Sequence, residues 1–249
     1  MRAFIFPGQG SQSVGMGTDL AEASAAARDV FAEVDDALGQ HLFRLMRDGP
    51  IETLTLTENA QPAIMANAIA TLRAAGIELS AAASFVAGHS LGEYSALCAA
   101  GAIDLATTAR LLKLRGRAMQ AAVPVGKGAM AALLGADLAT AQAIADAAAE
   151  GEVCAVANDN DPSQVVISGA KAAVERALGI AREKGARRAI LLPVSAPFHS
   201  PLMKPAAEKM AEALAGVEIA APAVPLYANV TASPVNAPAE IRDLLITRP

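Results

Sequence analysis

The chain has 249 residues, of which 53% are hydrophobic and 3% aromatic, and its formal net charge is −5. This apolar content suffices for the core of one large or two small domains, and the acidic balance argues against nucleic acid as a partner. Apolar runs are short and broken by charges or glycine, so we expect no membrane-spanning segment and no membrane partner.

The first predicted element is a strand over residues 4–6, followed by a glycine-containing loop, PGQGSQ, at residues 7–12. Glycine lets a backbone approach a ligand closely, so a loop N–H is a candidate donor to an oxyanion. The alternative is a strand-to-helix turn without a ligand, because the glycine spacing is not that of a dinucleotide fingerprint.

Two predicted helices flank the next strand. The first covers residues 59–75, with Asn59 as its N-cap and Pro62 in its first turn. The second covers residues 104–120. Between them, an apolar run at residues 84–87 reads as a strand.

The pentapeptide GHSLG at residues 88–92 follows that strand and precedes a helical stretch. This is the context of a nucleophile elbow, in which a strand, a sharp turn and a helix expose a serine. We therefore predict Ser90 as a catalytic nucleophile. A serine hydroxyl is a poor nucleophile alone, so a base must lie elsewhere in the chain.

A break at residues 124–128 opens a second pattern, which ends before a loop at residues 193–200. It reads as strand 129–134, helix 138–149, strands 153–157 and 164–168, helix 170–184 and strand 188–192. This βαββαβ order predicts a small ferredoxin-like domain, residues 124–192, inserted into a large parallel-sheet, hydrolase-like α/β domain, residues 1–123 and 193–249.

Three histidines could serve as the base. His41 lies among helix and turn residues and reads as a surface or helix-end histidine. His89 adjoins the nucleophile, where the elbow turns its side chain away, so we expect it to line the turn. His199 follows a strand on a loop, the usual place for a residue that reaches a site at strand ends, and is the predicted base.

Five segments occur in one order: FPGQGSQ at 6–12, QPA at 61–63, GHSLGEY at 88–94, RGRAM at 115–119 and APFHS at 196–200. Together they resemble the malonyl-CoA:acyl carrier protein transacylase family of fatty acid synthesis. The resemblance covers the whole chain. It implies malonyl-CoA and acyl carrier protein as partners, transfer through an acyl-enzyme, and no cofactor or metal.

The resemblance also implies roles for individual residues. Ser90 is the nucleophile and His199 its base, and the backbone N–H groups of Gln9 and Leu91 form the oxyanion hole. Arg115 holds the free carboxylate of malonate, which suits a planar guanidinium because it can give two parallel charge-assisted bonds. The further substrate-binding candidates are Gln9, His89, Phe198, Asn158 and Asn160. Phe198, directly before His199, is more typical of an enzyme selective for malonyl groups than of one selective for methylmalonyl groups.

Three different functions remain open on the sequence. An esterase or thioesterase of the α/β-hydrolase type would need an acid, such as Asp159 or Asp161. These residues fall in the run NDNDP at 158–162, which reads as a loop. The sequence is also compatible with a polyketide-synthase-type acyltransferase and with a non-catalytic descendant of the enzyme family.

The inserted domain's second helix and its exit carry a group of basic residues that could dock an acidic carrier or the phosphates of coenzyme A. The alternative is a solvated helix face, because Glu175 and Glu183 intervene. The group consists of Lys171, Arg176, Arg182, Lys184, Arg187 and Arg188.

Cys98 and Cys154 are too few and too scattered for a disulfide framework or a zinc site, which favours a reducing, cytoplasmic location. Met1 leads directly into the first strand, so we expect no signal peptide. The chain stops short of the family's usual length, which would leave a sheet edge or an apolar face exposed. A monomer is favoured.

Overall fold

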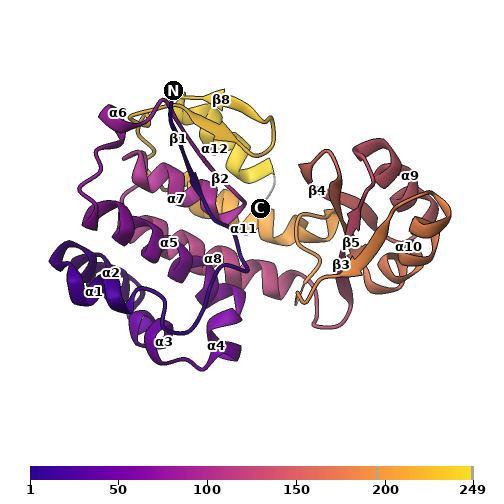
Figure 1. Cartoon of the computed structure of the whole chain (residues 1–249), viewed down its shortest axis with the longest axis horizontal. Coiled ribbons are helices and arrows are strands. Elements are labelled where there is room, and N and C mark those ends of the chain that lie inside the picture. The colour runs from indigo at the N-terminus through magenta and orange to yellow at the C-terminus, as the bar shows by residue number, and fades with distance from the viewer. Residues whose placement is uncertain (195, 248–249) are drawn as a thin grey trace. The chain divides into compact units, whose positions relative to one another are not determined.

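The computed structural model describes residues 1–194 and 196–247, which divide into two compact units (Figure 1). Of the described residues, the first unit comprises Met1–Arg117 and residues 209–247, and the second comprises Ala118–Glu208. The domain ranges expected from the sequence stay a prediction. Their residues 195, 248 and 249 lie outside the described part of the chain.

The first unit is built on a four-stranded sheet in the order β1-β2-β7-β8. Its strands are β1 (Ala3–Phe6), β2 (Phe85–Gly88), β7 (Leu226–Ala228) and β8 (Ser233–Val235). The first three run parallel and β8 is antiparallel to β7. Phe6 pairs with Gly88, so β1 and β2 end side by side and the segments that follow them start together. The predicted α/β parallel sheet is confirmed.

The helices of the first unit are α1 (Thr18–Ala23), α2 (Ala25–Leu38), α3 (Leu42–Asp48), α4 (Ile51–Thr55), α5 (Thr57–Ala74), α6 (Leu79–Ala82), α7 (Leu91–Ala99) and α12 (Pro238–Thr247). Helix α7 packs on the sheet and on α5, and α5 also packs on α2. Every residue of α7 from Leu91 to Leu97 is buried, as expected for a helix covered on all sides. Helix α8 (Leu105–Ala122) begins in this unit, and α11 (Lys204–Ala215) ends in it.

Helix α5 begins two residues earlier than predicted, and Asn59 is not its N-cap. Leu56 holds that position without a side-chain cap. The side chain of Asn59 donates instead to the carbonyl of Thr53 at 2.9 Å and accepts from Lys113 Nζ at 2.8 Å. Asn59 does not cap the helix because its side chain bonds to Thr53 and Lys113 instead, and Lys113 lies too far away in the sequence for a local pattern to reveal it.

The second unit contains an antiparallel sheet in the order β4-β5-β3-β6 with two long helices of its own. Its elements are β3 (Gly128–Leu134), α9 (Leu138–Ala149), β4 (Cys154–Asp161), β5 (Gln164–Ala170), α10 (Lys171–Glu183), β6 (Arg188–Leu191) and the 3₁₀ turn η1 (Pro201–Met203). The predicted ferredoxin-like βαββαβ order is confirmed, and α9 has the predicted bounds.

The loop predicted at residues 158–162 is wrong for most of its length, because β4 continues to Asp161. Asn158 pairs with Val166 and Asp161 with Gln164, with two shifts of register between Val156 and Asp161. Such bulges let turn-forming residues stay in a strand. Only the short turn at 162–163 connects β4 to β5, and Asp161 Oδ1 accepts the Ser163 N–H at 2.7 Å there.

One face of the first unit's sheet carries exposed apolar side chains. Ile5 pairs with Ala87, and Ala87 with Tyr227, so the three side chains share a face. Ile5 is 76% exposed and Tyr227 37%.

None of the helices described is long and apolar enough to cross a membrane.

Candidate active site

Ser90 and His89 connect β2 to α7, and Ser90 has φ 54° and ψ −109°. A positive φ at a residue other than glycine costs on the order of 1–3 kcal/mol and persists only where the surroundings impose it. The strand, turn and helix predicted around the serine are confirmed. Its hydroxyl is therefore presented at the N-terminus of a buried helix.

Glycine is required on both sides of this turn. A Cβ at Gly88 would lie 1.9 Å from the backbone carbonyl of Gly92, and a Cβ at Gly92 would lie 2.4 Å from the carbonyl oxygen of Phe6. No side chain fits at such distances. The bare backbone brings the start of α7 against the end of β1.

Arg115 on α8 reaches the serine. Its Nη2 donates to Ser90 Oγ at 3.0 Å, and its Nη1 donates to Gln61 Oε1 at 2.8 Å. Arg115 is 2% exposed, and its guanidinium lies 5.7 Å from the centre of the Tyr94 ring. A buried, oriented cation beside a nucleophilic hydroxyl is suited to an anionic group on the same substrate.

A line of hydrogen bonds joins Arg115 to the glycine loop after β1. Gln61 Nε2 donates to Thr57 Oγ1 at 2.9 Å, and Thr57 Oγ1 donates to Gln9 Oε1 at 2.9 Å. Thr57 and Gln61 are both 1% exposed. The arginine and the loop therefore hold their positions through the first turns of α5.

The two predicted oxyanion donors are the backbone N–H groups of Leu91, at the start of α7, and of Gln9, on the loop after β1. Leu91 is the first residue of α7, where a backbone N–H has no partner within the helix. Gln9 lies on the exposed loop, fixed by Thr57. The ring of the exposed His89 packs closely against the same loop. Its Nδ1 lies 2.5 Å from the position that a Cβ would take at Gly8.

Two more ionisable groups are buried beside the serine. Burial raises the pKa of Glu93 to about 7, although the backbone N–H of Asn229 and the charge of Arg115 lower it. Burial raises the pKa of Tyr94 to about 12 and lowers the pKa of Arg115. In the described part of the chain, the Tyr94 hydroxyl and Arg115 Nε have no hydrogen-bond partner.

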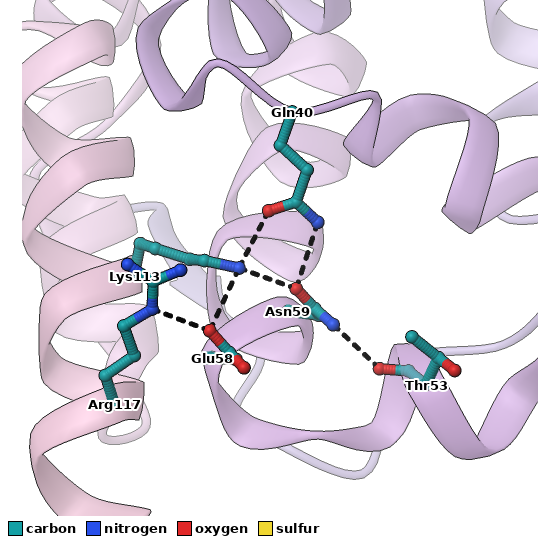
Figure 2. Close-up of polar contacts among 6 residues, drawn as sticks. All are labelled: Gln40, Thr53, Glu58, Asn59, Lys113 and Arg117. Atoms are coloured by element: carbon teal, nitrogen blue, oxygen red, sulfur yellow. Dashed lines mark hydrogen bonds and ion pairs between the residues drawn. The ribbon is translucent and has the colours of Figure 1, made fainter.

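A polar cluster ties α8 to α5 next to this site (Figure 2). Lys113 Nζ donates to Gln40 Oε1 at 2.7 Å and lies 3.2 Å from Glu58 Oε2, which also pairs with Arg117 Nε at 2.7 Å. These cations lower the pKa of Glu58, and burial lowers the pKa of Lys113. The backbones touch as well, because a Cβ at Gly116 would lie 2.5 Å from Glu58 Cα.

The loop of His199 is built inside the second unit. Pro197 packs on Gly128, where a Cβ would lie 2.3 Å from the proline ring, and Ser200 Oγ donates to the Pro197 carbonyl at 2.7 Å. His199 itself is half-buried with φ 56°. Phe198 is buried in the unit's core with Met130 and other apolar residues.

The remaining predicted residues also belong to the second unit. Asn158 is half-buried and Asn160 exposed on β4. Asp159 is exposed, and the carboxylate of Asp161 accepts both the N–H and the hydroxyl of Ser163, which lowers its pKa. His41, expected at a helix end, is the exposed N-cap residue of α3, and this expectation is confirmed.

The structure thus joins Ser90, Arg115 and Gln9 within one unit. Three further residues of this site, Thr57, Glu93 and Asn229, were not predicted as site residues from the sequence. Gln61 belongs to the QPA motif at residues 61–63, but no role was predicted for it. Within the described ranges, no group of three or more metal-ligating side chains gathers.

Known proteins are similar to this chain over almost its whole length. A family model for the acyl transferase domain matches residues 3–243. The malonyl CoA-acyl carrier protein transacylase of Escherichia coli K12 is 48% identical over 244 residues, which cover 98% of this chain and 79% of that protein.

Solved structures agree. The acyl-carrier-protein-S-malonyltransferase of Bartonella henselae superposes with a TM-score of 0.95 at 55% identity, over 99% of this chain and 80% of that one. A malonyl-transacylase solved in complex with a holo type II PKS acyl-carrier protein superposes with a TM-score of 0.93 at 44% identity, over 98% of this chain and 79% of that one.

Proposed function

Because the chain belongs to the acyl transferase family, we propose that it carries a malonyl group from malonyl-CoA to acyl carrier protein through an ester on Ser90. Malonyl transfer to acyl carrier protein is the activity that the names of its relatives state, and we place this chain's reaction in fatty acid synthesis. The observation that carries the proposed route is the 3.0 Å contact between Arg115 Nη2 and Ser90 Oγ. It places a carboxylate-binding cation at the nucleophile.

In the first half-reaction, Ser90 Oγ attacks the thioester carbonyl while His199 takes the hydroxyl proton. The oxyanion forms against the N–H groups of Gln9 and Leu91. The carbon–sulfur bond then breaks, and coenzyme A leaves as a thiol with the proton from His199. Malonate remains as an ester on the serine.

In the second half-reaction, the phosphopantetheine thiol of the carrier gives its proton to His199 and attacks the ester. The carbon–oxygen bond breaks, and the proton returns to Ser90 Oγ. Throughout, Arg115 holds the carboxylate that does not react. Gln61 keeps the guanidinium oriented by accepting from Nη1, so the cation does not need to reorganise.

Acyl carrier protein is the partner in the related complex. In the basic group of the second unit, Lys171 pairs with Glu175, and Arg176 pairs with Glu150 and Glu152. The exposed members that remain as a docking candidate are Arg182, Lys184, Arg187 and Arg188. Contacts of His89, Phe198, Asn158 and Asn160 with substrate, and a monomeric state, remain part of the proposal.

A cytoplasmic location also belongs to the proposal. Cys98 and Cys154 are unpaired thiols, which agrees with a reducing compartment. An esterase or thioesterase would use Asp159 or Asp161 to orient His199. The bonds of Asp161 to Ser163 occupy that carboxylate within its own turn and do not support this alternative.

The test is intact mass spectrometry after brief incubation with malonyl-CoA and a denaturing quench. We expect a malonyl adduct that maps to Ser90, clears on addition of holo acyl carrier protein and is absent from Ser90→Ala. An adduct that clears equally fast in water would support a hydrolase. An adduct that persists in Ser90→Ala would overturn the nucleophile assignment.

A further inference from the structure

Asn229, directly after β7, holds both sides of the nucleophile turn. Its Oδ1 accepts the backbone N–H of Ser90 at 2.8 Å, and its Nδ2 donates to the carbonyl of Gly88 at 2.6 Å. Gly88 and Ser90 are the last residue of β2 and the N-cap residue of α7. One side-chain amide therefore spans the whole sharp part of the elbow.

The amide replaces a strand that has ended. β2 and β7 pair through Val86 with Leu226 and Ala87 with Tyr227, and β7 stops at Ala228. The backbone groups of β2 beyond this point need new partners, because buried peptide groups are nearly always hydrogen-bonded. A carboxamide offers the same donor and acceptor as a peptide group, so Asn229 extends the ladder into the turn.

The helix that the turn feeds holds Asn229 in return. The backbone N–H of Asn229 donates to Glu93 Oε1 at 3.1 Å, and Glu93 is 7% exposed in the first turns of α7. The backbone of Glu93 donates to the Ser90 carbonyl at 3.0 Å. Ser90, Glu93 and Asn229 therefore form a closed ring of hydrogen bonds around the positive φ of the serine.

We propose that Asn229 is a positioning residue for Ser90, whose amide fixes the backbone of the nucleophile without touching the substrate. This inference rests on the proposed role of Ser90. The Asn229 amide fixes the two peptide planes on either side of His89, which set the direction in which the chain enters Ser90 and so that of Oγ. The next plane, which carries the N–H of Leu91, is held through the Ser90 carbonyl by the backbone N–H of Glu93, whose side chain accepts from Asn229. The N–H of Ser90 is occupied by Asn229, which leaves Leu91 as the elbow's oxyanion donor.

The test separates positioning from folding and from binding. Wild type, Asn229→Ala and Asn229→Asp are mixed with malonyl-CoA in single-turnover experiments, and the maximal rate of Ser90 acylation and the half-saturating concentration are determined separately. Asn236→Ala, an exposed asparagine of the same unit, is the matched control. Thermal unfolding of each variant sets a common temperature at which all are folded.

We expect Asn229→Ala to lower the maximal rate about 10- to 100-fold, with the half-saturating concentration within about threefold of wild type, since Gln61 still anchors Arg115. Asn229→Asp keeps the acceptor for the Ser90 N–H and should fall between Ala and wild type. It also carries the test if the alanine variant does not fold. Asn236→Ala should match wild type.

A second probe distinguishes this inference from the proposed function. Phenylmethylsulfonyl fluoride sulfonylates an activated serine and has no carboxylate for Arg115. The rate of Ser90 sulfonylation should therefore fall in Asn229→Ala by the same factor as the maximal rate of acylation. A folded Asn229→Ala or Asn229→Asp that acylates at the wild-type rate would overturn the inference, as would a loss confined to the half-saturating concentration. Failure of wild type to form any adduct on Ser90 would overturn the proposed function itself.

Discussion

Arg115 donates to the Oγ of Ser90 across 3.0 Å, so the cation and the nucleophile meet at one point. The hydroxyl is an acceptor in this contact. An arriving carboxylate is a stronger acceptor for the same guanidinium and would release the serine for reaction. Only a substrate with a free carboxylate would then release the Ser90 hydroxyl from Arg115 as it binds.

Arg115→Ala should therefore affect malonyl transfer far more than acetyl transfer, because acetyl has no second carboxylate. Loss of a buried charge-assisted pair costs about 2–4 kcal/mol, which is roughly 30- to 1,000-fold in kcat/KM. Rates with malonyl-CoA and acetyl-CoA on the same preparation measure the ratio. Arg117→Ala, on the same helix with a side chain 64% exposed, is the control. Equal losses for both substrates would remove the clamp role.

Thr57→Val tests the line of hydrogen bonds from Arg115 to the glycine loop. The change preserves shape but removes the acceptor of Gln61 Nε2 and the donor to Gln9 Oε1. We expect about 1–3 kcal/mol less stability and a Ser90 acylation rate roughly tenfold lower. Thr71→Val, which alters an exposed hydroxyl on the same helix, should leave both unchanged. Wild-type rates in Thr57→Val would show that the line does not position the loop.

Glu93 should make the protein less stable as pH rises toward neutrality. Its pKa is raised from 4.5 to about 7, so the folded state binds the proton more tightly than the unfolded state. The resulting stabilisation, about 3 kcal/mol, is fully present below pH 4.5 and is lost as pH rises through 7.

Glu93→Gln retains an acceptor for the Asn229 N–H and does not titrate. The free energy of unfolding from urea denaturation at pH 5 and pH 8 should therefore fall less in Glu93→Gln than in wild type. Glu22→Gln, an exposed change in the same unit, should follow wild type. Identical pH dependence in wild type and Glu93→Gln would contradict the assignment.

Two helical glycines should respond in opposite directions to alanine. At Gly116 a Cβ would lie 2.5 Å from Glu58 Cα and 2.6 Å from the Thr57 carbonyl, so α8 and α5 would have to separate. We expect Gly116→Ala to cost about 1–3 kcal/mol. Gly179 on α10 has open space around it, and Gly179→Ala should add about 0.5–1 kcal/mol by removing backbone freedom. Thermal unfolding of both variants measures the difference, and a stabilised Gly116→Ala would disprove the close packing.

Local patterns in the chain were sufficient for the elements with a strong period or a demanding turn. The βαββαβ order of the second unit and the strand, turn and helix around Ser90 follow from alternation, helical spacing and glycine placement. These signals are local, because a two-glycine turn and an amphipathic helix are specified by residues near one another in the chain. The same reasoning failed at Asn158 and Asp161, where pairing with β5 overrode turn propensity.

Ser90 was predicted from its motif and His199 by elimination among three histidines, whereas the role of Arg115 was predicted from the resemblance to a known family. Only the tertiary structure showed that Gln61 orients the arginine, that Thr57 connects it to Gln9, and that Asn229 holds a turn 139 positions away in the chain. Nothing near Asn229 in sequence indicates such a partner. Hydrogen bonds between distant segments depend on how the strands and helices pack, and packing is a property of the whole fold.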